Sequence, residues 1–182
     1  MSALERVVWA EGMLMSPQHL QHQDDYHEAL LEARVAALAP HAWGVCELSI
    51  DLPALEAGQV LVRAFRGVFP SGATLQLTAG IGRPIEGQLA PPRERLDVYL
   101  VLPRARAGAA NYTREEGEQA HLRYRVAPRP VWDAVTPERE ERIELARFNA
   151  QLRFGDEPRE NVEWLKIAEL VRDPSGKPSL SS

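Results

Sequence analysis

The sequence is poor in the residues that cross-link small domains or carry much of enzyme chemistry. Its 182 residues include one cysteine, Cys46, so an internal disulfide framework and a cysteine-rich zinc site are excluded. No apolar run approaches the roughly 20 residues of a membrane-spanning helix, and residues 1–6 lead into no signal-peptide core. Basic residues are outnumbered, 21 against 26 acidic, and they are scattered, which argues against a nucleic-acid partner. We therefore expect a cytoplasmic protein with an ordinary buried core.

One long helix is predicted over residues 16–39. Ser16 is a favourable N-cap, Pro17 is a favourable first helical residue, and Pro40 ends the helix. The first half is almost wholly polar, whereas the second half carries most of an apolar stripe, so we expect the second half to pack and the first half to face water or a partner. The stripe consists of Leu20, Leu31, Val35 and Leu38.

After Pro40 the hydrophobic period changes from 3.6 to 2, which predicts strands. The predicted strands are 46–52, 61–69, 74–78, 96–102, 122–126, 141–154 and 164–172. The second and third form a hairpin through Pro70, Ser71 and Gly72, and the nearly all-apolar 96–102 is typical of a central strand. Loops are expected at 81–95, 104–118 and 127–139. Because no crossover helices link these strands, the fold is predicted to be mainly β, an antiparallel β-sandwich with one N-terminal α-helix.

The domain organisation is predicted to be simple. Residues 1–173 form the sandwich domain, and residues 174–182, rich in proline, serine and glycine, form a linker toward a further part of the protein.

The search for chemistry favours a protein without a reactive site. His19 and His22 have a spacing that can hold zinc, but at 100° per residue His27 points about 140° away from His22. A solvated or partner-facing helix turn is therefore favoured over a metal site. Cys46 is expected to be a small core residue rather than a nucleophile, and Glu11 a structural residue rather than a general base.

Tryptophan offers a second group of candidates. All four, Trp9, Trp43, Trp132 and Trp164, are expected to pack in the core or at its edges, because no basic stripe accompanies them as in a nucleic-acid platform. Trp132 lies in a proline-rich segment, where an apolar side chain can be displayed to a partner. The loop at 80–84 lacks the helix that a dinucleotide site needs, so no cofactor is expected.

The most specific signal is the segment from Trp9 to Gln23. It follows the pattern W-x-E-G-M-x-x-x-P-Q-H-x-Q-x-Q, which resembles the start of the TssK family, the baseplate subunits of bacterial type VI secretion systems. His41–Val45 resembles the family's W-G-V segment, and Arg66–Ala73 is similar to its F-P-D-G turn, with Ser71 in place of the usual aspartate. Segments 97–103, 148–152 and 164–172 keep the family's order.

This resemblance implies a non-enzymatic, trimeric adaptor whose N-terminal shoulder is a β-sandwich similar to the shoulder of siphophage receptor-binding proteins. It implies that the shoulder binds the wedge proteins TssF and TssG. It also implies a helical neck and a C-terminal head, which are missing here, with the head contacting the TssJ-TssL-TssM membrane complex. The isolated chain is then expected to be a monomer or a weak oligomer.

We expect the opening motif to contribute to such an interface, with Trp9 either anchoring a partner or packing beneath the helix. The candidate partner-binding residues are Trp9, Glu11, Gln18, His19, Gln21 and Trp132. Two alternatives remain open. One is another phage-tail-like structural protein, and the other is a carbohydrate-binding or hydrolytic β-sandwich, which would need converging carboxylates or a metal cluster.

Overall fold

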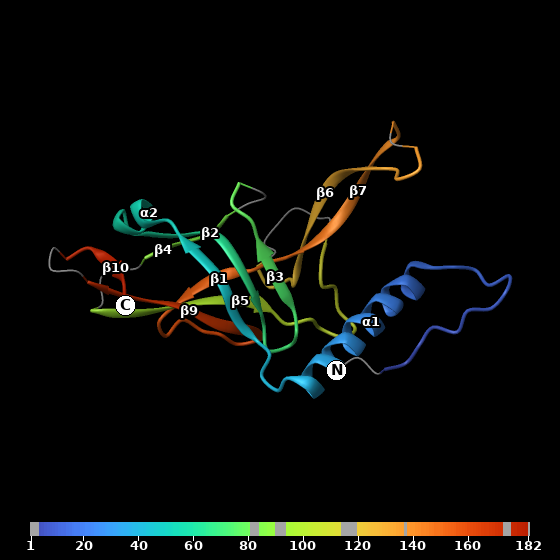
Figure 1. Cartoon of the computed structure of the whole chain (residues 1–182), viewed down its shortest axis with the longest axis horizontal. Coiled ribbons are helices and arrows are strands. Elements are labelled where there is room, and N and C mark those ends of the chain that lie inside the picture. Colours follow the sequence, from blue (N-terminus) through green and yellow to red (C-terminus); the bar gives the residue numbers. More distant parts are fainter. Residues whose placement is uncertain are drawn as a thin grey trace.

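Two four-stranded antiparallel sheets pack face to face, and a two-stranded hairpin and a long helix project from them (Figure 1). This computed structural model describes residues 4–80, 84–89, 94–113, 120–136, 138–172 and 176–181. The elements are α1 (Pro17–Leu38), β1 (Gly44–Ile50), α2 (Leu52–Glu56), β2 (Gln59–Val68), β3 (Thr74–Leu77), β4 (Ile85–Gln88), β5 (Arg95–Pro103), β6 (Tyr124–Trp132), β7 (Glu140–Phe148), β8 (Gln151–Phe154), β9 (Val162–Arg172) and β10 (Pro178–Leu180). The predicted antiparallel β-sandwich with one long N-terminal helix is confirmed.

The core lies between the two sheets. The first sheet has the order β1-β2-β3, with β4 also paired to β2, and the second has the order β10-β9-β5-β8. The predicted 61–69/74–78 hairpin is confirmed as β2 and β3, and 96–102 is confirmed as the central strand β5, paired on both sides. The buried core side chains are Leu55, Val60, Val62, Phe65, Phe69, Val98, Leu100, Leu102, Leu152, Phe154, Leu165, Ile167 and Leu170.

Helix α1 begins and ends as predicted, but its predicted packing is wrong. Leu31 is 65% exposed and Leu38 is 87% exposed, and Tyr26 is the one buried residue of α1. The reason is its position, because α1 lies beside the end of the sandwich instead of across a sheet face (Figure 1). The apolar stripe therefore faces away from the core of this chain.

Strand β1 departs from its predicted alternation at Cys46. A register shift between Val45 and Glu47 leaves Cys46 without a paired residue, and the side chain is exposed. The prediction that Cys46 is a core residue is thus wrong, because a bulge inserts one residue and moves the side chain to the other face. Farther along, Asp51 caps the unpredicted short helix α2, its carboxylate accepting the Ala54 N–H at 2.9 Å.

The prediction of a loop over residues 127–139 is wrong for its first half, because β6 continues to Trp132 through two prolines. Pro128 and Pro130 are tolerated there because, among the described strands, β6 pairs with β7 alone, so a missing N–H can face solvent. The prediction of one continuous strand over residues 141–154 is also wrong. It divides at Asn149 into β7, which pairs with β6, and β8, which pairs with β5.

Two further strands lie in regions predicted to be irregular. Ile85–Gln88 forms β4 within the predicted loop 81–95, of which 81–83 and 90–93 lie outside the described residues. Pro178–Leu180 forms β10 against the end of β9, so this part of the predicted linker belongs to the sheet. Of the predicted loop 104–118, residues 104–113 contain no strand and 114–118 are outside the described residues.

Candidate partner-binding surfaces

The opening motif builds the start of α1. At the third helical position the His19 side chain turns back, and its Nδ1 accepts the Ser16 N–H at 3.1 Å and lies 2.8 Å from Ser16 Oγ. This is the geometry of a capping box, in which a side chain satisfies a backbone group that the first turn leaves unpaired. His19 was predicted to bind a partner, and the structure gives its Nδ1 atom an internal capping contact.

The arm, residues 4–16, folds back along α1 and is held there by side chains of the helix. Arg6 Nε donates to the Tyr26 hydroxyl at 2.8 Å, with its guanidinium 5.2 Å from the ring centroid. His22 Nε2 lies 3.2 Å from the Glu5 carbonyl oxygen. Tyr26 is therefore buried by the arm, which explains why the most polar stretch of the helix contains its one buried side chain.

The other predicted residues of the motif are on the surface. Trp9 is 50% exposed, with its ring centroid 6.1 Å from that of His19, so it partly covers the helix start and partly faces solvent. Glu11 lies in the exposed turn at the tip of the arm, and Gln18 is exposed on the first turn of α1. Gln21 Nε2 donates to the Tyr112 hydroxyl at 3.2 Å, a contact between α1 and the β5–β6 connection.

Helix α1 also contacts the β2–β3 turn, through Gly72. This glycine has φ +85°, and a Cβ placed on it would lie 3.0 Å from Cγ of Glu32. The turn therefore needs glycine for its backbone conformation and for the close approach of the helix. The resembled F-P-D-G segment thus positions α1, a role that its sequence alone did not indicate.

Trp132 lies apart from the motif, at the far end of the β6–β7 hairpin, where it pairs with Glu140 and is 59% exposed. The structure therefore brings Trp9 and His19 together, with Gln18 exposed on the same turn of α1, and places Trp132 on a second surface. In Figure 1 this hairpin projects away from the sandwich.

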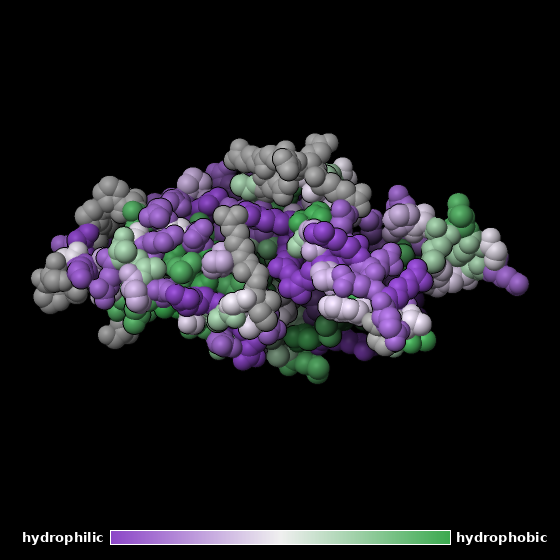
Figure 2. Space-filling view, turned by 90° about the horizontal axis from the view of Figure 1, so that it is seen from above, coloured by the Kyte–Doolittle hydropathy of each residue, from purple (hydrophilic) through white to green (hydrophobic). Residues whose placement is uncertain are grey.

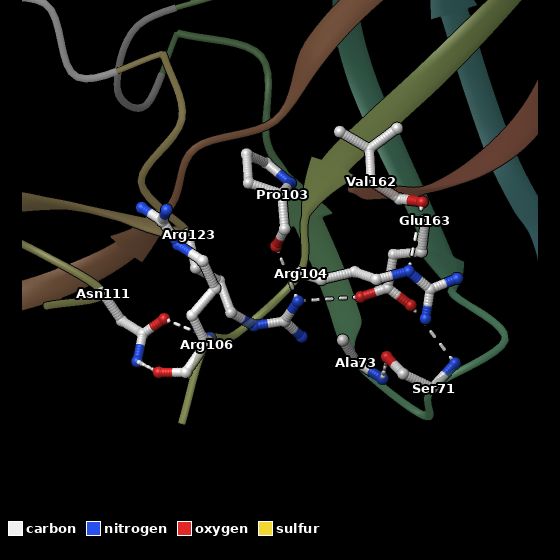
Figure 3. Close-up of polar contacts among 9 residues, drawn as sticks. All are labelled: Ser71, Ala73, Pro103, Arg104, Arg106, Asn111, Arg123, Val162 and Glu163. Atoms are coloured by element: carbon white, nitrogen blue, oxygen red, sulfur yellow. Dashed lines mark hydrogen bonds and ion pairs between the residues drawn. The ribbon is translucent and has the colours of Figure 1, made fainter. Parts of the chain in front are cut away.

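A buried ion pair fixes the base of the hairpin (Figure 3). Arg123 Nη1 donates to Glu163 Oε1 at 2.8 Å and to the Pro103 carbonyl oxygen at 2.9 Å. The second carboxylate oxygen of Glu163 accepts the Ser71 N–H at 3.3 Å, which ties the β2–β3 turn to β9. Arg123 thereby joins the hairpin, β5 and β9. Sequence reasoning missed this role because Arg123 and Arg125 alternate with apolar residues in the segment 122–126, a pattern that predicts a solvated face for the arginines.

Exposed side chains outside the hairpin form ion pairs on the sheet surface. The hydrogen bond from Lys166 lowers the pKa of Asp97, with Tyr99 adding to the effect against the opposing influence of burial. Asp97 and Glu169 in turn raise the pKa of Lys166. Among the described residues, no three histidine, cysteine, aspartate or glutamate side chains are placed to hold a metal ion. Nor does any helix in the described part have the length and hydropathy needed to span a bilayer.

The exposed surface is large for the size of the chain. The accessible area is 12,946 Å², whereas a compact monomer of 20.3 kDa exposes about 8,800 Å². Figure 2 shows hydrophobic residues at the end of the molecule formed by the arm. Of the two placements predicted for the tryptophans, core or edge, the core is wrong, because all four are between 46% and 59% exposed. Large aromatic side chains of this kind are enriched in protein–protein interfaces.

These features define the class, a β-sandwich domain that displays a helix and a hairpin. The sequence matches over residues 19–182 the family described as "Bacterial Type VI secretion, VC_A0110, EvfL, ImpJ, VasE". The chain therefore belongs to this type VI secretion family, which includes TssK, and the predicted membership is confirmed.

The chain is also similar in sequence and in fold to known TssK proteins. The type VI secretion system baseplate component TssK1 of Pseudomonas aeruginosa strain PAO1 is 38% identical over 118 residues, which are 65% of this chain and 26% of that protein. A crystal structure of TssK matches with a TM-score of 0.86 at 24% identity, covering 98% of this chain and 41% of the other. TssK in a cryo-electron microscopy structure of the TssK-TssF-TssG baseplate subcomplex matches with a TM-score of 0.89 at 20% identity, covering 98% and 60%. The two structures share the fold, and this chain spans about a quarter of the curated relative.

Proposed function

We propose that this chain is the sandwich domain through which a TssK-family baseplate subunit docks onto a wedge of TssF and TssG. The observation that carries the proposal is the match of 98% of the chain to TssK within a TssK-TssF-TssG assembly. The large exposed area supports it, because a surface of this size with projecting apolar side chains suits assembly. The role is structural and not enzymatic, which agrees with the curated relative being a baseplate component.

The docking surface is formed by the arm and the first turns of α1. This region gathers exposed apolar side chains, and the capping contact of His19 holds the arm and the helix start in a defined geometry. The exposed apolar residues of the arm are Leu4, Val8, Trp9, Leu14 and Met15. Trp9 is the anchor, Glu11 and Gln18 provide polar contacts at the rim, and Trp132 provides a second contact on the hairpin.

The direct test is the affinity of the purified chain for immobilised TssF-TssG complex from the same organism. Trp9→Ala is expected to weaken binding by about 2 kcal/mol, roughly 30-fold, because truncating a buried aromatic anchor has costs of this size. Glu11→Ala and Gln18→Ala are expected to weaken it only a few-fold. Unchanged affinity for all three variants, with the wild type binding, would move the interface away from the arm.

Gln21 needs a matched control because it has an internal partner. Gln21→Ala removes both a possible rim contact and the hydrogen bond to Tyr112, whereas Tyr112→Phe removes the hydrogen bond alone. A larger loss of affinity for Gln21→Ala than for Tyr112→Phe assigns Gln21 to the interface. Equal losses assign it to the support of α1.

In the complete protein, we propose that the chain continues beyond β10 into a neck and a head that complete a homotrimer and link it to the TssJ-TssL-TssM membrane complex on the cytoplasmic side. The support is the family membership together with the greater length of the relatives. Light scattering is expected to find this chain alone as a monomer or a weak oligomer at micromolar concentration. A tight trimer would instead locate a strong subunit interface within the sandwich domain.

A further inference from the structure

A groove of about 990 Å³ lies between the outer edge of β3 and the base of the β6–β7 hairpin. In the sheet order β3 pairs with β2, and among the described strands none covers its other edge. An uncovered edge strand presents backbone N–H and C=O groups that can pair with another chain. Half-buried apolar side chains on the two sides of the groove give it an apolar lining. They are Leu75, Leu77, Val126 and Leu145.

The charge of this groove is opposite to that of the whole chain. The chain has a formal net charge of −5, yet the groove lining contains four arginines and one acidic residue, Glu86. The four arginines are Arg125, Arg129, Arg147 and Arg153. A local excess of positive charge on an acidic protein favours an anionic occupant.

Two of these arginines stand directly opposite one another. Arg125 on β6 and Arg147 on β7 are register partners, so their side chains share one face of the hairpin. Like charges at such a position destabilise the pair of strands. Arg125 donates to Asn149 Oδ1, but within the described part of the chain the guanidinium groups of Arg129 and Arg147 have no hydrogen bond or ion pair. A carboxylate bound between Arg125 and Arg147 would relieve the repulsion.

We propose that this groove binds an extended acidic segment of a partner protein, which adds a strand to the free edge of β3. Backbone pairing with β3 supplies part of the affinity. Alternate side chains supply the specificity, with apolar residues toward the groove lining and carboxylates toward the arginines. The inference rests on the proposed function in taking this segment from TssF or TssG, and it adds to that function a defined site and the chemistry that the site recognises.

The first test compares two charge reversals on the same hairpin. Arg147→Glu changes the groove, whereas Arg142→Glu makes the same charge change on the opposite face of β7. Arg147→Glu should fold normally, because the new carboxylate would face Arg125 and form a favourable cross-strand pair. It is expected to weaken TssF-TssG binding about tenfold or more, the size of a lost charge-assisted contact, and Arg142→Glu less than twofold. Equal affinity of Arg147→Glu and wild type would overturn the groove site and leave the proposed function standing.

The second test locates the added strand by hydrogen–deuterium exchange. In the complex, amides of β3 are expected to exchange more slowly, while amides of β1, the opposite edge of the same sheet, keep their rate. Protection of β1 with unprotected β3 would overturn the inference.

A probe peptide keeps the inference testable if TssF-TssG does not bind, an outcome that would overturn the proposed function itself. The probe is a short synthetic peptide in which glutamate alternates with valine, and its controls carry lysine for glutamate or N-methylated backbone amides. The acidic peptide is expected to protect β3 and to lose affinity for Arg147→Glu, and both controls are expected to bind at least tenfold more weakly. Equal binding of all three peptides would exclude recognition by charge and strand pairing.

Discussion

The sandwich core and helix α1 both contain large apolar side chains, but the core buries these side chains whereas α1 leaves them exposed. In the core, Phe65 on β2 and Leu100 on β5 are enclosed between the two sheets, with about 1% of Phe65 and none of Leu100 exposed. On α1, Leu31 and Leu38 face outward. The difference lies in the neighbours, because each sheet covers the other, whereas α1 contacts the sandwich mainly near its β2–β3 turn.

The two regions contribute differently to the stability of the chain. Burial of apolar surface stabilises the chain by roughly 25 cal/mol per Å², so the enclosed core supplies the stability of the fold. The stripe on α1 contributes little to that stability within this chain. Its exposed apolar surface is available to another protein, in addition to the docking surface proposed for the arm and the first turns of α1.

The strongest test of the contrast removes one large side chain from each region. Phe65→Ala is expected to lower the free energy of unfolding by about 3–5 kcal/mol, because it leaves a cavity in the core. Leu38→Ala is expected to change it by less than about 0.5 kcal/mol, because this side chain is already solvated. Urea unfolding at equilibrium measures both values, and similar losses would show that α1 packs on the sandwich in solution.

Removal of one partner of the buried ion pair at the hairpin base is expected to have the next largest effect on stability. Arg123→Met leaves the Glu163 carboxylate buried without its cation and is expected to lower the free energy of unfolding by about 3 kcal/mol. The double variant Arg123→Met/Glu163→Leu is expected to recover part of this loss, since no unpaired charge remains. Urea unfolding of the two variants gives the comparison. Greater stability of the single variant than of the double would contradict it.

The contact between α1 and the sandwich can be tested with a pair of glycines. Gly72 and Gly58 have nearly the same backbone conformation, φ +85° and +86°, but a Cβ meets Glu32 only at Gly72. Gly58→Ala is expected to lower the free energy of unfolding by about 1 kcal/mol, because a Cβ is unfavourable in the left-handed conformation. Gly72→Ala is expected to lower the free energy of unfolding by more than this, because its Cβ would also meet Glu32, and to speed hydrogen exchange in α1. Equal stabilities and unchanged α1 exchange would mean that Glu32 moves aside freely.

The smallest expected effect is a pH dependence at the edge of the sandwich. The hydrogen bond from the Ala54 N–H, helped by Arg63, lowers the pKa of Asp51 against the effect of burial. A carboxyl whose pKa is lower in the folded state stabilises the fold fully above its unfolded pKa, about 3.9, and loses that contribution as pH falls through the folded pKa. The stability difference between wild type and Asp51→Asn is therefore expected to be largest above pH 5 and to shrink below about pH 4. Urea unfolding from pH 3 to 6 measures it, and a difference that stays constant over this range would contradict the role assigned to Asp51.

Local patterns explain why much of this fold was predictable. Ser16 and Pro17 define the start of α1, and the alternation in β2 defines both the strand and the face that it buries. The candidate site was predicted less completely. Trp9 does lie beside His19 at the start of α1, but the buried position of Arg123 depends on the approach of β5 and β9.

The sequence by itself determined the fold class, the bounds of α1 and the family, because all three depend on local patterns and on motif order. The tertiary structure decided which apolar surfaces are covered, since a stripe on α1 and a stripe on β2 look alike until their neighbours are placed. It also decided the exposure of Cys46, where a single bulge reverses the face, and the division of residues 140–154 between two sheets at Asn149. Asn149 is held by the Leu122 and Arg123 carbonyl oxygens, which are distant in sequence, so no local pattern could reveal the break.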